Sequence, residues 1–200
     1  ALEEPLKWRK ASVVFVCSMG DLFHEDVTFE FVDNVMDVIS KTPQHTYQLL
    51  TKRAERMAEY FSSRLIPQNV WLGVTVEDTL TKYRIDFLRN LSAQVKFLSC
   101  EPLLCDLGEL DLEGVDWIIV GGESGPIARP MKEEWVLNIK RQAEQKSIPF
   151  FFKQWGTWSK EGVKGNKKKN GKLLQGEVIQ QMPKVVHENF RNKDQTKFWE

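Results

Sequence analysis

Short apolar runs alternate along the chain with segments whose apolar residues recur every three or four positions. The runs are rich in β-branched and aromatic residues, and they predict strands over residues 13–19, 46–51, 70–76, 95–100, 117–120 and 149–153. Helical spacing follows most of them, over residues 29–40, 54–61, 80–91 and 133–145. Residues 101–112 have a looser pattern. The order of elements is therefore strand and helix in alternation almost to the end.

Alternation of this kind builds a parallel sheet whose right-handed crossovers place helices on its outside. The sequence predicts an α/β fold in which the strands are neighbours in chain order and form a βα barrel. We expect residues 1–155 to form this barrel. Residues 156–200 are expected to form a short irregular extension packed on the same domain, with a lysine-rich, hairpin-like loop at 164–172.

Polar residues recur at the carboxyl ends of the predicted strands, where barrels carry their sites. Three ends read as a small residue, any residue and then Glu, which gives Glu77, Glu101 and Glu123. Side-chain alternation puts the mixed face of each strand, with its Glu, inside the barrel and the aliphatic face against the helices. Charge at strand ends is also common in ordinary loops, but its repetition here favours a polar, ligand-sized site at the barrel mouth.

Lys153 follows three phenylalanines and enters an apolar neighbourhood, where an unpaired ammonium is costly. We therefore expect Lys153, or its neighbour Gln154, to reach a carboxylate of Glu77, Glu101 or Glu123. The alternation places all three glutamates at equivalent heights on neighbouring strands. Lys52 and Arg53 add positive charge at another strand end.

Composition narrows the class of protein. Of the 200 residues 42% are hydrophobic, which rules out disorder of the whole chain, and 28 basic residues balance 28 acidic ones. A net charge of zero gives no global sign of a nucleic-acid or membrane binder. No apolar run is long enough to span a bilayer. Three unpatterned cysteines suit a reducing compartment, so we expect a cytoplasmic protein without a structural metal.

Seven motifs in order carry a resemblance to a known family. They are VFVCSMGDLFHED (14–26), QLLTKR (48–53), NVWLGVTVE (69–77), FLSCEPL (97–103), WIIVGGESGP (117–126), ARP (128–130) and FFFKQWG (150–156). Together they resemble the phage gene-product 37/68 family over residues 2–183. Members of that family look like radical S-adenosylmethionine enzymes with a partial βα barrel and a cysteine cluster in an N-terminal segment.

The resemblance implies that a full-length protein uses S-adenosylmethionine and a 4Fe–4S cluster, although this chain as it stands requires neither. The chain begins on Ala1, after the position of the cysteine segment, and Cys17, Cys100 and Cys105 do not match cluster ligands. A missing first βα unit would leave the barrel open on one side. The apolar edge near Val14 and Val16 would then be exposed and could pair with a second copy in a homodimer.

The resemblance also implies roles for site residues. Ser18 and Asp21 would lie near the methionyl end of the cofactor, Thr75 and Glu77 near the ribose, and Gly121 and Gly122 near adenine. Glu101, Glu123 and Lys153 are the candidate catalytic residues. The candidates for binding an unknown small-molecule or macromolecular substrate are Lys52, Arg53, Ser124, Arg129 and Gln154.

Two alternatives stay open at the level of the sequence. In the first, Glu77, Glu101 and Glu123, with His24 as a further ligand, bind a divalent cation such as Mg²⁺ or Mn²⁺ in a metal-dependent barrel enzyme. In the second, the chain is a non-catalytic phage accessory protein that grips nucleic acid through the lysine-rich loop at 164–172.

Overall fold

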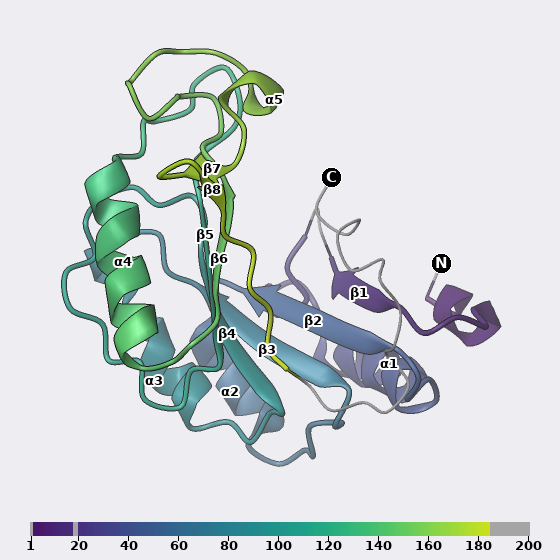
Figure 1. The fold of residues 1–200 in the computed structure, drawn as a ribbon. Coiled ribbons are helices and arrows are strands. Elements are labelled where there is room, and N and C mark those ends of the chain that lie inside the picture. Colours follow the sequence, from purple (N-terminus) through teal and green to yellow (C-terminus); the bar gives the residue numbers. More distant parts are fainter. Residues whose placement is uncertain (1, 18–19, 185–200) are drawn as a thin grey trace.

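A computed structural model describes residues 2–17 and 20–184. Its centre is a sheet of six parallel strands that are neighbours in chain order and curl into an open half-barrel (Figure 1). The strands are β1 (Val13–Val16), β2 (Thr46–Thr51), β3 (Val70–Thr75), β4 (Val95–Cys100), β5 (Trp117–Gly121) and β6 (Phe150–Gln154). The predicted parallel order and the partial barrel are confirmed.

Helices cover one face of this sheet (Figure 1). They are α1 (Phe29–Ser40), α2 (Ala54–Phe61), α3 (Arg84–Arg89) and α4 (Glu133–Gln145). The helix expected over 80–91 is shorter than predicted, because the Asp78 carboxylate accepts a hydrogen bond from the Thr81 amide and caps a separate 3₁₀ turn, η2 (Thr79–Thr81). The first strand also ends early: Cys17 has a φ of 62°, which is not extended backbone.

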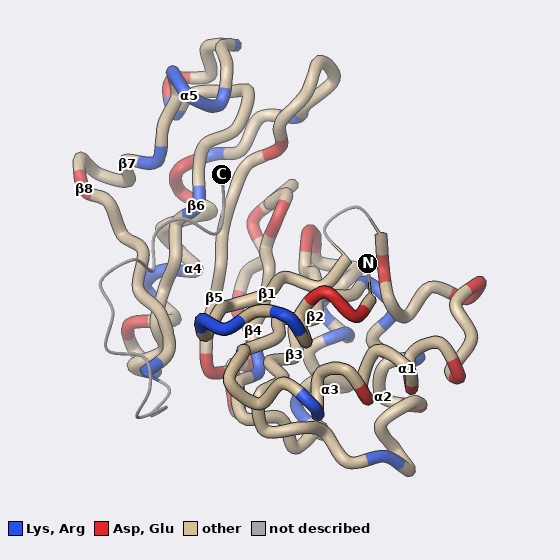
Figure 2. The backbone as a smooth tube through the Cα atoms, turned by 90° about the vertical axis from the view of Figure 1, so that its right-hand side faces the viewer, with Lys and Arg blue, Asp and Glu red and all other residues tan. Residues whose placement is uncertain are grey.

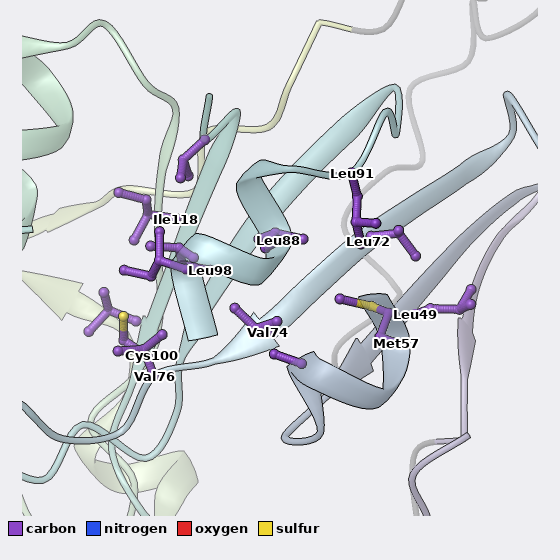
Figure 3. Close-up of a cluster of buried hydrophobic side chains, with 14 of the residues drawn as sticks. Leu49, Met57, Leu72, Val74, Val76, Leu88, Leu91, Leu98, Cys100 and Ile118 are labelled. Carbon is purple, nitrogen blue, oxygen red and sulfur yellow. The ribbon is translucent and has the colours of Figure 1, made fainter. Parts of the chain in front are cut away.

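The aliphatic faces of the strands form a core with the helices, as the alternation predicted. Leu49, Leu72, Leu98 and Ile118 come from four successive strands and are buried side by side under α2 and α3 (Figure 3). Val74 and Val76 continue this layer toward the carboxyl edge. Burial of side chains of this size contributes roughly 1.5–3 kcal/mol each.

The opposite, concave face of the sheet is filled by aromatic rings near the amino ends of the strands. Trp117 lies at the centre of this floor, with ring centroids 6.0 Å from Trp71, 5.7 Å from Phe97 and 5.8 Å from Phe151. Gly73 makes room for the Phe97 ring, since a Cβ on Gly73 would lie 2.4 Å from it. The floor therefore consists mainly of aromatic rings, and the ion-paired side chains of this face lie at the carboxyl end of the half-barrel.

The chain after β6 folds back onto the sheet. Residues 179–181 run antiparallel to β6, with the Phe152 amide donating to the Ile179 carbonyl at 2.7 Å. Before that, α5 (Lys167–Asn170) precedes a small hairpin of β7 (Leu173–Leu174) and β8 (Glu177–Val178). Residues 185–200 of the predicted extension lie outside the described part.

The lysine-rich segment differs from its predicted conformation. It forms one turn of helix instead of a hairpin loop, because the Asn166 side chain accepts from the Lys169 amide at 2.9 Å and Gly171, with a φ of 69°, ends the turn. A hairpin turn follows at Gln175 and Gly176, where both residues have positive φ.

Strand β1 forms one edge of the sheet, and all four of its residues are half-buried. This is the open side that was expected near Val14 and Val16. Pairing of this edge with a second copy stays a prediction. Within the described residues, each helix is too short or too polar to cross a bilayer.

Candidate functional site

The register of the strands brings the predicted acidic residues to the concave mouth at two levels. Thr75 pairs with Ser99 across β3 and β4, so Glu77 and Glu101, each two residues farther, lie at the same height. Ser99 in turn pairs with Ile119 on β5. This register places Gly121, not Glu123, beside Glu101. The prediction of three glutamates at equivalent heights is therefore wrong for Glu123, which lies two residues beyond that level.

Lys153 and Glu101 form an ion pair across the mouth. Their Nζ and Oε2 atoms are 2.9 Å apart, and the two side chains are only 23% and 16% exposed. The contact predicted for Lys153 is confirmed. The Ser99 hydroxyl donates to the other carboxylate oxygen at 3.2 Å. Gly121 supplies the space, since a Cβ there would lie 2.9 Å from Glu101 Oε2.

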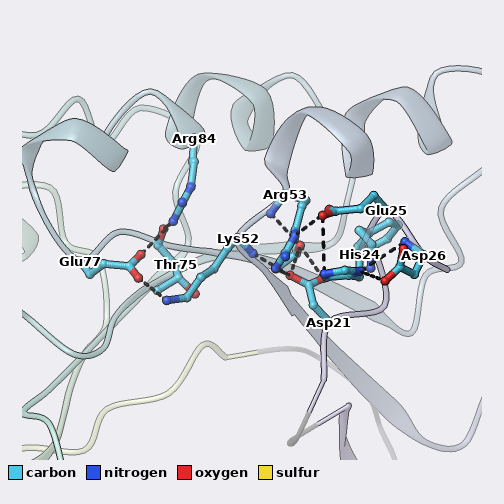
Figure 4. A network of polar contacts seen from close by, with 11 residues as sticks. Asp21, His24, Glu25, Asp26, Lys52, Arg53, Thr75, Glu77 and Arg84 are labelled. Carbon is cyan, nitrogen blue, oxygen red and sulfur yellow. Dashed lines mark hydrogen bonds and ion pairs between the residues drawn. The ribbon is translucent and has the colours of Figure 1, made fainter. Parts of the chain in front are cut away.

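Glu77 is held by two cations from different elements (Figure 4). Arg84 Nη1, at the start of α3, lies 2.8 Å from Oε2 and also donates to the Thr75 carbonyl at 2.8 Å. Lys52, at the end of β2, contacts Oε1. Sequence reasoning missed Arg84, because only strand ends were considered. The available signal was a cation in the helix immediately after β3.

Asp21 ties the β1–α1 loop to the end of β2. Its carboxylate accepts hydrogen bonds from the Thr51 hydroxyl at 2.7 Å, the Lys52 amide at 3.1 Å and Arg53 Nη1 at 3.2 Å. The Phe23 amide donates to it as well, at 2.9 Å. With these partners, Asp21 orients the segment that carries Lys52 and Arg53. Ser18, the other residue expected near the methionyl end, lies outside the described residues.

His24 lies at the far end of the same network and contacts the acids of its own loop (Figure 4). Its ring nitrogens are 3.7 Å from Glu25 and 3.4 Å from Asp26. The Asp26 amide donates to Nδ1 at 3.2 Å. His24 is thus engaged in the β1–α1 loop and does not join the three glutamates.

Glu123 pairs with Arg129 within one loop above β5. The guanidinium donates to both carboxylate oxygens, at 2.9 and 2.8 Å, and the Arg129 amide adds a third bond at 2.8 Å. These bonds favour the ionised carboxylate and lower the pKa of Glu123 to about 2. Arg129, predicted to bind substrate, is therefore half of a bidentate pair at the rim.

The glycines at the end of β5 allow two backbones to approach closely. A Cβ on Gly122 would lie 1.9 Å from the Trp155 carbonyl oxygen, and one on Gly156 would lie 2.2 Å from the Glu123 carbonyl. The Gly122 amide donates to the Gln154 carbonyl at 2.9 Å. Packing within the protein therefore explains Gly122 without a ligand. We call residues 121–130 and 154–155 the lip.

Gln154 and Ser124 also belong to the lip. The Gln154 amide nitrogen lies 3.3 Å from the Ser124 hydroxyl and 3.4 Å from the Gly122 carbonyl, whereas its buried carbonyl oxygen has no hydrogen-bond partner. These two candidate substrate-binding residues therefore contact each other at the rim.

Charges of opposite sign alternate around the whole mouth. Proceeding from β2 to β6, the pairs are Asp21 with Arg53, Glu77 with Lys52 and Arg84, Glu101 with Lys153, and Glu123 with Arg129. The three glutamates are thus neutralised separately. Across residues 2–17 and 20–184, no group of three or more His, Cys, Asp or Glu side chains is arranged to hold a metal ion.

The described cysteines do not fit an iron–sulfur cluster. Cys100 is fully buried in the core beneath the helices, and this burial raises the pKa of its thiol. Cys105 packs at the margin of the same core, whereas Cys17 is exposed at the end of β1. An iron–sulfur cluster requires several cysteine thiolates gathered at one point, and these three cysteines occupy different environments.

Two buried donors on the concave face lack acceptors. Gln48 and Trp71 are neighbours in the β2–β3 register and are 1% and 4% exposed. Neither Gln48 Nε2 nor Trp71 Nε1 has a hydrogen-bond partner. An unpaired buried donor costs about 1–3 kcal/mol, so each of these two groups carries an energetic cost within the fold.

A family model described as "Protein of unknown function (DUF5131)" matches residues 1–183. The chain belongs to this family. For this DUF5131 chain, comparisons with curated proteins and with solved structures gave no significant match. The description of the family assigns no activity to DUF5131 proteins.

Proposed function

We propose that this chain is the barrel of a phage-associated, radical S-adenosylmethionine-type enzyme, and that its mouth binds S-adenosylmethionine. The observation that carries the proposal is the alternation of acids and cations at the carboxyl edge of a six-stranded parallel half-barrel. The cofactor carries a carboxylate, an ammonium and a sulfonium, so it offers both signs of charge to such a rim. The resemblance of the strand-end motifs to the phage gene-product 37/68 family supports the same assignment.

Within this proposal the ion pairs have distinct tasks. Glu77, with Thr75 beside it, accepts from the ribose hydroxyls. Lys52 and Arg53 face the substrate, and Asp21 is a positioning residue that orients both through its bonds to the end of β2. Placing adenine near Gly121 and Gly122 stays a prediction of the resemblance, since contacts within the protein already account for both glycines.

The partly buried Glu101–Lys153 pair is the best placed for proton transfer. It combines an acid and a cation 2.9 Å apart with low exposure, and it points into the mouth from neighbouring regions of the sheet. Glu123 and Arg129 form the outer rim, where Ser124 and Gln154 add hydrogen-bonding groups for a substrate.

The described cysteines do not fit the 4Fe–4S cluster that the resemblance implies. The divalent-metal alternative gains no support from the geometry, because a separate cation holds each of the three glutamates.

Isothermal titration calorimetry with S-adenosylmethionine and S-adenosylhomocysteine tests the proposal. We expect the chain to bind the first ligand more tightly, because only it carries the sulfonium charge. Glu77→Gln should weaken binding about tenfold, which corresponds to about 1.4 kcal/mol for one charged contact. Asp33→Asn is the matched control: Asp33 is also held by an arginine, Arg64, but it belongs to α1 and lies on the helical face, away from the mouth.

Absence of binding by the wild-type chain would overturn the proposal. If wild type and Glu77→Gln bound S-adenosylmethionine with equal affinity, the mouth would not be the binding site. Equal weakening by Glu77→Gln and Asp33→Asn would show a general loss of stability and would also count against a role for Glu77 at the ligand.

A further inference from the structure

A strongly basic lobe stands beside the lip. We define it as residues 156–172, which contain a single acid, Glu161, and six lysines: Lys160, Lys164, Lys167, Lys168, Lys169 and Lys172. Its net charge is 6 − 1 = +5, whereas the whole chain is neutral with 28 basic and 28 acidic residues. The rest of the chain therefore carries a net charge of −5. Figure 2 shows this concentration of basic residues around α5, at one end of the molecule.

The lysines of α5 are available to a partner. Lys167, Lys168 and Lys169 are all exposed, and none has an ion pair or side-chain hydrogen bond with another described residue. Other lysines of the lobe serve the fold, since Lys164 donates to the Pro126 carbonyl at 2.8 Å and Lys172 to Gln180 at 3.1 Å. Three like charges in succession repel one another, so a partner that neutralises them is favoured.

The lobe is fixed to the lip by several contacts. The Trp158 indole donates to the Ala128 carbonyl at 2.6 Å, and the Thr157 amide donates to the Glu123 carbonyl at 2.9 Å. The Gly125 amide in turn donates to the Thr157 hydroxyl at 3.0 Å. Anything bound on the lobe is thereby held next to the Glu123–Arg129 rim of the mouth.

We propose that the basic lobe binds the phosphate backbone of a nucleic acid and presents it to the mouth. Consecutive residues of a helix point about 100° apart, so the three lysines of α5 fan out over more than half of its circumference. A phosphate chain that curves around the turn reaches all three. A membrane surface would need an apolar stripe opposite the charges, and α5 contains only lysines and Asn170.

The experiment is fluorescence anisotropy with labelled single-stranded and duplex oligonucleotides of mixed sequence, titrated between about 50 and 200 mM salt. The test variant is Lys167→Gln/Lys168→Gln/Lys169→Gln. The matched control, Lys7→Gln/Lys41→Gln/Lys132→Gln, also removes three exposed lysines, but each of these is paired with an acid elsewhere on the surface. Circular dichroism checks that both variants are folded.

We expect wild type and control to bind with the same steep dependence on salt. The α5 variant should bind more weakly, and its slope of log K against log[salt] should be shallower by about 2, from three lost contacts at roughly 0.7 each on a single strand. Anionic vesicles and polyglutamate serve as competing polyanions. The inference is overturned by absence of oligonucleotide binding, by an unchanged slope in the α5 variant, or by equal binding of either competitor.

This inference does not rest on binding of S-adenosylmethionine. Calorimetry with that cofactor and anisotropy with oligonucleotides are separate measurements, and the three lysines lie outside the mouth. If the chain bound only one of the two ligands, the proposal about that ligand would stand and the other would be refuted.

Discussion

Replacing Gly122 by Ala tests whether the end of β5 is built for packing or for a ligand. The added Cβ would lie 1.9 Å from the Trp155 carbonyl oxygen and 2.8 Å from its carbon. Carbon and oxygen normally approach to about 3.3 Å, so the two backbones would have to separate by more than about 1 Å. The obstacle is backbone, which cannot turn aside as a flexible side chain can.

The cost can be estimated from two contributions. Overpacking in a tight site costs about 1–3 kcal/mol. Separation also weakens the hydrogen bond from the Gly122 amide to the Gln154 carbonyl, worth about 0.5–1.5 kcal/mol. Alanine also lowers the conformational entropy of the unfolded chain, which stabilises the folded protein by about 0.4–1 kcal/mol. The free energy of unfolding should therefore fall by roughly 2 kcal/mol.

Urea unfolding, followed by tryptophan fluorescence and circular dichroism, measures this change. Gly20→Ala is the control, because a Cβ at Gly20 has no heavy atom within 4 Å, and it should change stability by less than about 0.5 kcal/mol. If Gly122→Ala unfolded at the same midpoint as wild type with the same m-value, the close approach to Trp155 would be refuted. Gly122 would then be better explained by approach of a ligand.

Three further predictions concern the charged groups of the mouth. Lys153→Met should lower the free energy of unfolding, measured in urea, by about 1–3 kcal/mol, because the largely buried Glu101 carboxylate loses its cation. The double variant Lys153→Met/Glu101→Gln should recover most of that loss. If the effects of the two substitutions simply add, Lys153 and Glu101 are not energetically coupled. The ionised Glu123 carboxylate should stabilise the fold at pH values above 4.5, its pKa in the unfolded chain, and this stabilisation should be lost as the pH falls toward about 2. In Arg129→Gln, NMR titration of the carboxyl groups should show the pKa of Glu123 returning toward 4.5. Asp21→Asn should lower the melting temperature measurably, since the carboxylate has several donors and is 12% exposed; an unchanged value would deny its positioning role.

Much of the architecture follows from the pattern of apolar runs. Each strand has an aliphatic face that needs helices over it, and the interval between strands is long enough for a crossover helix. These two facts suffice for a parallel sheet in chain order. Boundaries were less predictable: helix α3 is short because Asp78, a residue with no special place in the hydrophobic pattern, caps a separate turn before it.

The antiparallel segment 179–181 shows where pattern reasoning fails. Its residues, Ile-Gln-Gln, have no strand signature, yet they pair with β6 and the Gln181 carbonyl accepts from the Trp117 indole at 2.9 Å. The pairing depends on the free edge of β6 and on the Trp117 indole donor, and both exist only in the folded sheet. The local sequence of residues 179–181 gives no sign of either.

The candidate site was predictable to the extent that strand alternation fixes how far along its strand each side chain lies and toward which face of the sheet it points. Alternation was enough to bring Lys153 to Glu101, because both side chains project to the concave face at the same end of their strands. It was not enough for Glu123, whose level depends on the β4–β5 register, or for Glu77, whose partner Arg84 comes from the next helix. Pairings across elements require the three-dimensional arrangement.

The self-neutralised mouth restricts the kind of ligand that can bind there. Glu77 and Glu101 already have cations within contact distance, so a neutral ligand would gain little from either carboxylate and would have to break an ion pair to reach it. A ligand that carries both charges can replace each partner that it displaces, and the charges of the rim stay compensated throughout. S-adenosylhomocysteine keeps the carboxylate and the ammonium and lacks only the sulfonium, so comparing the two ligands isolates the contribution of the sulfonium charge to binding at the mouth. The two ligands differ by one methyl group and one positive charge, and only the charge is a feature that a rim of alternating ion pairs distinguishes.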